Sequence, residues 1–404
     1  MNKLKYIFIT LILLVNYSYS FMSVDDSGTA AGSFLKLGAG ARAAGLGEAY
    51  SAVAGSANSV YWNPAGLNAV RDLNICLMHS VWFAGLNYEW VAGAIRLDEK
   101  SAFGIGLQYM GYGDIVKTDD TGLNTGSFTP TDMAVIGSFG TELEGFKIGF
   151  SVKNLTLTII NTATAVSFDA GIMKEIKLDN NTLMLSVAGY NLSGGIKYID
   201  DTTGLPFILR FGTAYFMGDS FLLACDVTAP SDGKLYAAAG LEYQLKLSKE
   251  FIIMLRGGYN TKTLDTLGSM SGMAAGGGIK YGDLQVDYAY KPYGDLGTTH
   301  RFSVAMDLGE LLPEEERKLR KKNEERKIEE LKAANKEVTT ESPASKKEDL
   351  KEVKKEITKE LNEVKKEVTV ENAAPKKKVK RIIRKVKQAD GSTKYLTITP
   401  DEPK

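Results

Sequence analysis

Hydrophobic and polar residues alternate along the middle of the chain. Between residues 146 and 153 every second position is Phe, Ile, Phe or Val, and Lys147, Gly149 and Lys153 occupy positions of the opposite parity. The same alternation recurs at 207–212, 284–290 and 301–308. A period of two is typical of a strand with one apolar face. The pattern predicts about fourteen strands of roughly ten residues, over 73–83, 88–97, 102–112, 132–141, 146–155, 163–176, 182–192, 205–216, 221–227, 234–244, 251–259, 272–281, 284–291 and 299–308.

The connections between these strands differ in length according to strand parity. Those after even-numbered strands are short, such as 142–145, 217–220 and 282–283, whereas those after odd-numbered strands include 113–131, 193–204 and 260–271. Outer-membrane barrels have short periplasmic turns and long external loops. We therefore predict an all-β fold, a fourteen-stranded antiparallel transmembrane β-barrel, whose even strand number places the N- and C-termini in the periplasm.

Aromatic residues gather near both predicted ends of the strands, which favours two girdles at headgroup level. The predicted outer girdle is Tyr109, Tyr112, Tyr190, Tyr259, Tyr290, Trp82, Tyr88 and Trp90, and the inner one is Tyr215, Phe216, Tyr243 and Tyr281.

Charged residues on the strands lie opposite the apolar rows. They are Lys147, Lys153, Asp169, Arg210, Glu242, Arg256, Lys280, Asp287 and Arg301. Charges that face lipid are costly, so these side chains are expected to face the lumen. There they either pair with one another and with backbone or line a ligand path, and we favour pairing.

The segment from 33 to 68 precedes the strands and consists mostly of small residues. Because Gly and Ala keep the chain thin, such a segment packs closely against other backbone. We predict that it is a plug inside the barrel. The residues that define this plug motif are Gly38, Gly40, Arg42, Gly45, Gly47, Asn63, Pro64, Ala65 and Gly66.

The two ends of the chain have a different composition from the strands. Residues 1–20 combine two Lys residues with a short apolar run, which indicates a signal peptide cut near Ser20. The total of 404 residues has no net charge, yet 313–404 carries +7 and the remainder −7. We therefore expect four parts: signal peptide 1–20, plug 21–72, barrel 73–312 and a charged periplasmic tail 313–404. The tail has helix-forming stretches, one apolar helical stripe and a hairpin at 389–391.

Chemistry that would indicate an enzyme is scarce. His79 and His300 have no Cys or His at ligand spacing, so we expect no metal site. Residues 38–43 match a dinucleotide fingerprint loosely, without the βαβ context that it requires. Cys76 and Cys225 are predicted on opposite faces and unpaired. We expect no catalytic residue, no cofactor and no nucleic-acid partner.

Residues 38–49, the run Trp62-Asn63-Pro64-Ala65-Gly66-Leu67, and 288–301 resemble the PorV/PorQ family, which is similar to the FadL-type outer-membrane transporters. The resemblance covers roughly 28–309. It implies a fourteen-stranded barrel with an N-terminal plug, and it places the Asn-Pro-Ala segment in the hatch. PorV-type relatives serve type IX secretion, whereas FadL-type relatives pass hydrophobic molecules through the wall or lumen. The long charged tail departs from both.

Three functions remain open at this point. The first is a non-enzymatic outer-membrane barrel that assists protein secretion by binding export substrates or machinery. The second is a FadL-type channel for long-chain fatty acids or other hydrophobic compounds. The third is a structural barrel that tethers the outer membrane to the cell wall. The corresponding partners are outer-membrane lipid, secreted proteins or secretion machinery, hydrophobic small molecules, and, for the tail, peptidoglycan or a periplasmic protein.

Overall fold

The structure, a computed structural model, describes residues 28–198, 200–308, 326, 382–387 and 393–398. It divides into two compact units, Met1–Leu311 and Leu312–Lys404. The predicted signal peptide and the tail's helical stretches lie outside the described residues. In the second unit, β19 (Ile382–Lys387) and β20 (Thr393–Ile398) pair antiparallel, which is the hairpin that the sequence predicts.

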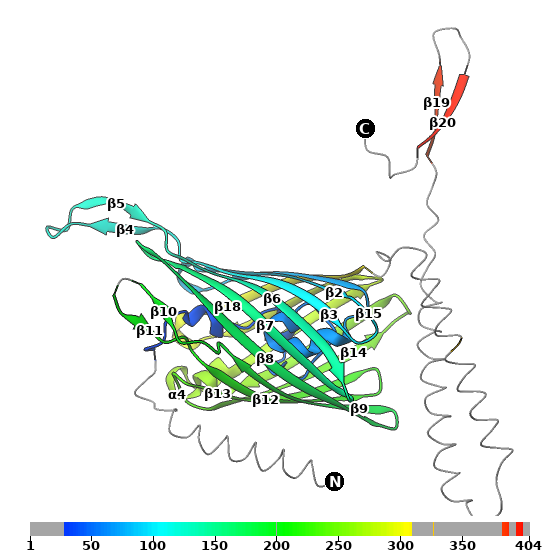
Figure 1. Ribbon diagram of the computed structural model, residues 1–404, viewed down its shortest axis with the longest axis horizontal. Helices are drawn as coiled ribbons and strands as arrows, with labels where there is room; N and C mark the ends of the chain where they lie inside the picture. Colours follow the sequence, from blue (N-terminus) through cyan, green and yellow to red (C-terminus); the bar gives the residue numbers. More distant parts are fainter. Residues whose placement is uncertain (1–27, 199, 309–325, 327–381, 388–392, 399–404) are drawn as a thin grey trace, which may run out of the picture. The chain divides into compact units, whose positions relative to one another are not determined.

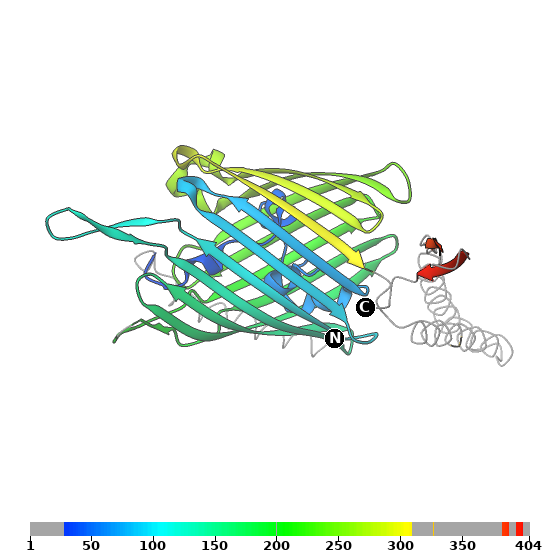
Figure 2. The same ribbon diagram turned by 90° about the horizontal axis from the view of Figure 1, so that it is seen from above.

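The first unit is a closed antiparallel barrel of fourteen strands, and the predicted fold class is confirmed (Figures 1 and 2). Each strand pairs with its neighbours along the chain, and β1 closes the sheet against β18. The strands are β1 (Leu73–Val81), β2 (Asn87–Arg96), β3 (Ala102–Gly111), β6 (Thr131–Leu143), β7 (Phe146–Thr158), β8 (Thr162–Leu178), β9 (Asn181–Tyr190), β12 (Ile208–Met217), β13 (Phe221–Pro230), β14 (Tyr236–Lys246), β15 (Phe251–Asn260), β16 (Met273–Tyr281), β17 (Leu284–Pro292) and β18 (Thr298–Leu308).

The outside of the barrel is apolar. Outward residues such as Phe103, Phe139 and Phe150 are 43–47% exposed, and similar side chains recur on strands around the barrel. Contiguous exposed apolar area of this kind marks a surface that is covered by something other than water. Among the described residues, no helix has both the length and the apolar character that crossing a membrane requires.

The inside of the barrel holds the small-residue segment (Figure 2). It folds into short helices: η3 (Ser33–Lys36), α2 (Ala41–Gly45), α3 (Ser59–Trp62) and η4 (Pro64–Ala69). Most of its residues are buried, including the aromatic side chains Tyr50, Tyr61 and Trp62. The predicted plug is therefore present, and it supplies the core that the barrel wall encloses.

The two rims of the barrel differ as the loop lengths predict. The short-turn rim carries turns such as 144–145 and 282–283. The long-loop rim carries β4 (Ile115–Thr118) with β5 (Asn124–Phe128), β10 (Ile196–Lys197) with β11 (Thr202–Thr203), and the helices η6 (Thr261–Thr263), α4 (Leu264–Leu267) and η7 (Ser269–Gly272). Two further turns of helix, η5 (Phe83–Gly85) and η8 (Gly294–Leu296), lie in the remaining connections of this rim. Figure 1 shows the β4–β5 hairpin extending beyond the barrel.

The described chain begins at the long-loop rim. The Ala31 N–H donates to the Gly204 carbonyl, 2.9 Å away, in the connection before β12. At the other end of the plug, the Asn68 amide donates to the Lys100 carbonyl at a short turn. The plug thus crosses the lumen from one rim to the other before β1 begins. The prediction that both termini are periplasmic concerns ends of the chain outside the described residues.

The predicted outer aromatic girdle is wrong for several of its members. Tyr88 and Trp90 are fully buried, and Tyr190 is 5% exposed, all facing the lumen. Tyr88 donates a hydrogen bond to the Leu37 carbonyl and Trp90 donates to Asn58. Trp82 and Tyr112 also pack against the core, as Phe216 of the inner girdle does. The hydroxyl of Tyr and the N–H of Trp need a hydrogen-bond acceptor when buried, and the plug supplies one in the lumen whereas lipid chains do not. Outward rings remain at Tyr243, Tyr281 and Tyr290.

Candidate functional site: the plug and its seat

The Asn-Pro-Ala-Gly turn fixes the second half of the plug. Asn63 caps η4, because its side-chain oxygen accepts the Ala65 N–H at 3.1 Å, and its amide donates to the Ser51 carbonyl. Pro64 occupies the first turn of η4, where a missing N–H costs nothing. Gly66 lies so close to Ser59 that an added Cβ would be 2.8 Å from its hydroxyl. Each residue of this turn is therefore of the type that its backbone position requires.

Inward glycines of the barrel form a track for the plug. A Cβ at Gly104 would lie 2.6 Å from Val60, and one at Gly140 would lie 2.6 Å from the Pro64 carbonyl oxygen. At Gly149 it would overlap the backbone of Pro64 and Ala65. The same obstruction is found at further inward positions, where the plug neighbour is Asn63, Ser51, Leu46, Gly47 or Gly45: Gly171, Gly212, Gly240, Gly258 and Gly276. Plug residues thus contact wall glycines around the barrel. The plug neighbour is a side chain at Gly104, Gly171 and Gly212 and backbone at the other five positions.

Two plug glycines are needed for their backbone conformation. Gly40 and Gly47 have φ values of 87° and 66°, in the region that residues with a Cβ disfavour. Gly47 also lies against β15, where a Cβ would be 2.7 Å from the Tyr259 nitrogen. Gly38 faces Glu48 and Trp62 at similarly short range. The motif glycines therefore shape the path of the plug and allow its contact with the wall.

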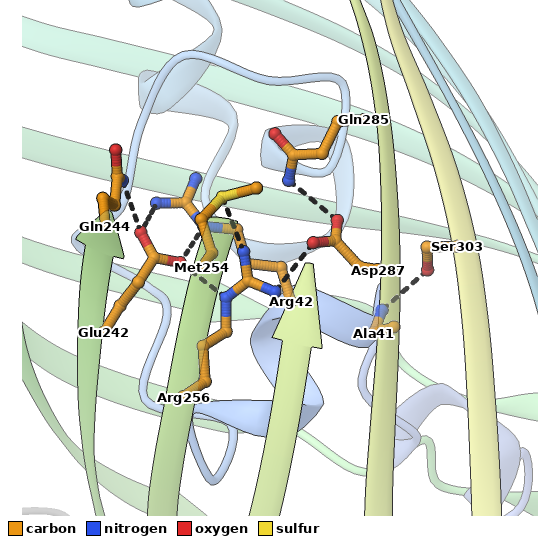
Figure 3. Close-up of polar contacts among 9 residues, drawn as sticks. All are labelled: Ala41, Arg42, Glu242, Gln244, Met254, Arg256, Gln285, Asp287 and Ser303. Carbon is orange, nitrogen blue, oxygen red and sulfur yellow. Dashed lines mark hydrogen bonds and ion pairs between the residues drawn. The ribbon is translucent and has the colours of Figure 1, made fainter. Parts of the chain in front are cut away.

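A buried ionic network ties the plug to three strands (Figure 3). Arg42 of α2 binds Glu242 of β14 through two hydrogen bonds of 2.7 and 2.8 Å. Arg256 of β15 donates to Glu242 at 2.6 Å and to Asp287 of β17 at 2.7 Å. The side chains of Glu242 and Arg256 are fully buried. Because a buried charge without its partner is strongly destabilising, this network holds α2 at one place on the wall.

Further polar contacts hold both ends of α2 and the turn that follows. The Ala41 N–H donates to the Ser303 hydroxyl at 2.7 Å. Arg301 donates to the Gly38 carbonyl at 3.0 Å and lies 3.4 Å from the Glu48 carboxylate. Asp226 accepts the backbone N–H groups of Tyr50 and Ser51 through one oxygen. Plug donors and acceptors are therefore satisfied by side chains from distant strands.

The remaining predicted lumen charges pair within the wall. Lys153 lies 2.8 Å from Asp169, and both side chains are almost fully buried. Lys147 pairs with Glu175 at 2.9 Å. Lys280 pairs with Asp307 near the short-turn rim, where the two side chains are 30% and 42% exposed. Arg210 differs from the others, because none of its described contacts is an ion pair.

Sequence reasoning missed several buried lumen groups. Glu48 and Lys291 are 8% and 4% exposed, and Asp226 is 2% exposed. Asp226 directly follows Cys225, which faces outward. Because neighbouring strand residues point to opposite faces, this position could have been predicted to face the lumen. Cys76 is buried in the lumen and Cys225 is exposed, so the two lie on opposite faces as predicted. Over the described ranges, no three His, Cys, Asp or Glu side chains gather as metal ligands.

Several solved structures are similar to this chain at low sequence identity. The toluene transporter TbuX of Ralstonia pickettii has a TM-score of 0.45 and 11% identity, and the match covers 67% of this chain and 97% of that chain. The Pseudomonas putida toluene transporter TodX has a TM-score of 0.42 and 14% identity, with 66% and 96% covered. A Pseudomonas aeruginosa FadL homologue has a TM-score of 0.41 and 11% identity, with 66% and 98% covered.

The family comparison is more specific than the structural one. No curated protein matches the sequence. The model of the family described as type IX secretion system protein PorV matches residues 23–201, which include the plug and the strands from β1 to β9. The resemblance carried by the plug motif is thereby confirmed over this range, and the chain is a closed antiparallel β-barrel protein whose residues 23–201 match the PorV family model.

Proposed function

We propose that this protein is a non-enzymatic outer-membrane barrel that assists protein secretion by binding exported proteins at its long-loop rim. The observation that carries the proposal is that the plug fills the lumen while the β4–β5 hairpin projects from the long-loop rim. Wall glycines contact the plug, and Glu242 of the wall binds both Arg42 of the plug and Arg256 of the wall, so the plug occupies the inside of the barrel. The family description, type IX secretion, agrees with this role.

The β4–β5 hairpin supplies a surface suited to a protein partner. Ile115, Val116 and Leu123 are 44–67% exposed, although large apolar side chains are uncommon at loop tips. The turn is ordered by Asp119, whose carboxylate accepts the N–H groups of Thr121 and Leu123. An ordered hairpin binds with a smaller entropic cost than a flexible loop. Its apolar residues are therefore available as anchors for a partner.

The proposal includes an orientation and roles for the parts of the chain. The long-loop rim faces the outside of the cell, and the short-turn rim faces the periplasm. Residues 1–20 are removed on export, 21–72 form the plug and 73–312 the barrel. Residues 313–404 extend into the periplasm, where their basic run touches peptidoglycan or a periplasmic protein. Asymmetric loop lengths support this orientation.

A channel for hydrophobic compounds is the main alternative. It needs a continuous apolar path between plug and wall. Inward Lys153, Arg210 and Glu242 and the glycine contacts weigh against such a path. Transport would require the plug to leave its seat, which breaks the Arg42–Glu242 pair.

The test compares secretion by cells that carry different versions of the hairpin. One version replaces residues 114–129 with a short Gly-Ser linker, and a second carries Val116→Ser and Leu123→Ser. The matched control carries Lys117→Ser and Thr125→Ser in the same hairpin. We expect the first two to lose co-purifying exported proteins and to release at least tenfold less cargo, since each apolar anchor contributes about 1–2 kcal/mol. Normal secretion by the linker version, with lipid co-purifying instead, would overturn the proposal.

A further inference from the structure

A small cavity lies between the first part of the plug and the wall. Its volume is about 10 Å³, the size of one water or one monatomic ion. The plug contributes Leu35 and Tyr61 to its lining, and the wall contributes Lys153, Tyr190, Ile208 and Arg210. One side of the cavity is therefore apolar, and the other presents two cations from β7 and β12.

Arg210 is a buried cation with an open donor. It is 6% exposed, and its Nε donates to the Thr228 hydroxyl at 3.1 Å. Its guanidinium lies over the rings of Trp62 and Tyr190, with centroids 4.8 and 5.4 Å away. Both rings therefore make cation–π contacts with the guanidinium. The Nη1 atom is buried and has no hydrogen-bond partner among the described residues.

The lining of the cavity contains two cations and no carboxylate. Lys153 is neutralised by Asp169 at 2.8 Å and also donates to Asn191. Asp226 is the other carboxylate near Arg210. One of its oxygens accepts the Tyr50 and Ser51 N–H groups, the other has no hydrogen-bond partner among the described residues, and neither belongs to the cavity lining. Arg210 forms no ion pair among the described residues. A buried charge without a counter-ion is unfavourable by several kcal/mol in general.

We propose that the cavity binds a single halide-sized anion, chloride in the cell, against Arg210 Nη1 with Lys153 as the second positive charge. A chloride would accept the open N–H and neutralise the guanidinium, whereas a water would do only the first. The volume excludes a carboxylate or phosphate group unless Leu35 or Ile208 moves. Because the lining comes from plug and wall, the anion would fasten residues 33–37 and α3 to β7 and β12. The proposal is independent of the secretion role.

The first test uses the wild-type protein in detergent at constant ionic strength. With chloride or bromide as the anion, the Tm is expected to exceed that in gluconate by about 5 °C, the shift for a ligand far above its Kd. Crystals grown in bromide are expected to show one anomalous peak next to Arg210 Nη1. Equal Tm values in the two salts, or an ordered water without bromide, would refute the site.

Two variants locate the effect. Arg210→Met removes the donor and Leu35→Phe fills the cavity without changing its charge, so each is expected to abolish the difference between chloride and gluconate. Lys147→Met, which alters a buried cation elsewhere in the wall, is expected to keep it. If Arg210→Met fails to fold, Leu35→Phe gives the answer alone. Stabilisation by oleate but not by bromide would overturn the proposal in favour of a ligand that enters by displacing Leu35.

Discussion

At the residue scale, two kinds of contact hold the plug in the barrel. Wall glycines allow the plug to approach closely, and charged wall residues pair with charged plug residues. Gly149 leaves room for the backbone of Pro64 and Ala65, and Gly171 leaves room for the Asn63 side chain. Arg42 of the plug pairs with Glu242 of β14. Neither kind of residue acts locally. Each is explained by a partner far away in the sequence, which makes the contacts specific for one seating of the plug.

The glycine track predicts a sharp difference between two neighbouring alanine variants. Gly149→Ala places a methyl group in the backbone of Pro64, and overpacking costs about 1–3 kcal/mol or more where backbone cannot yield. Gly137→Ala on the adjacent strand β6 meets nothing within 4 Å. We expect only Gly149→Ala to lower the folded fraction, measured as the share of unheated protein that runs at the folded position in gel electrophoresis. Equal behaviour of the two variants would show that the plug does not need this close approach.

The ionic network predicts a large cost for Arg42→Gln. The substitution leaves Glu242 buried with one partner fewer, and breaking such a pair costs about 3–5 kcal/mol. The control is Lys234→Gln, whose pair with Asp265 is exposed and worth under about 1 kcal/mol. Urea unfolding followed by tryptophan fluorescence is informative, because Trp62 and Trp90 are buried at the plug. A change below about 1 kcal/mol in Arg42→Gln would contradict the anchoring role.

At the element scale, the strands could be predicted from the sequence because the barrel repeats one rule. Most outward positions on the strands are apolar and the charged residues are concentrated on inward ones, so period-two alternation places most strand ends within a few residues. The hairpin strands β4 and β5 were missed, because Ile115 and Val116 are adjacent and both exposed. Tyr88 and Trp90 were misplaced, because their partners, Leu37 and Asn58, are in the plug and leave no local signal.

The same limit applies to the candidate site. Alternation placed Glu242, Arg256 and Asp287 in the lumen, but it could not say which of them meets Arg42. Inward glycines also alternate correctly, yet a glycine in a strand is ambiguous until the opposing backbone is known. Which residues meet is set by the winding of the plug, a property of the closed barrel.

The plug as an element yields a test that separates secretion from transport. The Ala41 N–H donates to the Ser303 hydroxyl at 2.7 Å, so α2 and β18 are in contact there, and the pair Ala41→Cys with Ser303→Cys is designed to link them by a disulfide, whose formation is checked by mass spectrometry. In a background that carries Cys225→Ser, cargo release by oxidised cells should equal release by reduced cells. A loss of function that reductant restores would show that the plug must move, as a channel requires.

At the scale of the whole molecule, the direction of the plug places the start of the described chain on the long-loop side. Ala31 contacts Gly204 there, whereas β18 ends at the short-turn rim. Thr29→Cys and Asp120→Cys, each with Cys225→Ser, are therefore expected to react together with an impermeant maleimide on intact cells. Asp179→Cys at a short turn is expected to react only after the outer membrane is opened. Reaction of Asp179→Cys alone on intact cells would invert the proposed orientation.

The seam between β1 and β18 has a consequence for biogenesis. These strands are neighbours in the sheet but lie at opposite ends of the barrel sequence, so their pairing brings together the most distant parts of the wall. Residues 33–70 are enclosed once that pairing is complete, and their contacts reach strands all around the circumference. We therefore expect the strands to close around a plug that already lies in the lumen, and the packed plug then sets a lower limit on the width of the barrel.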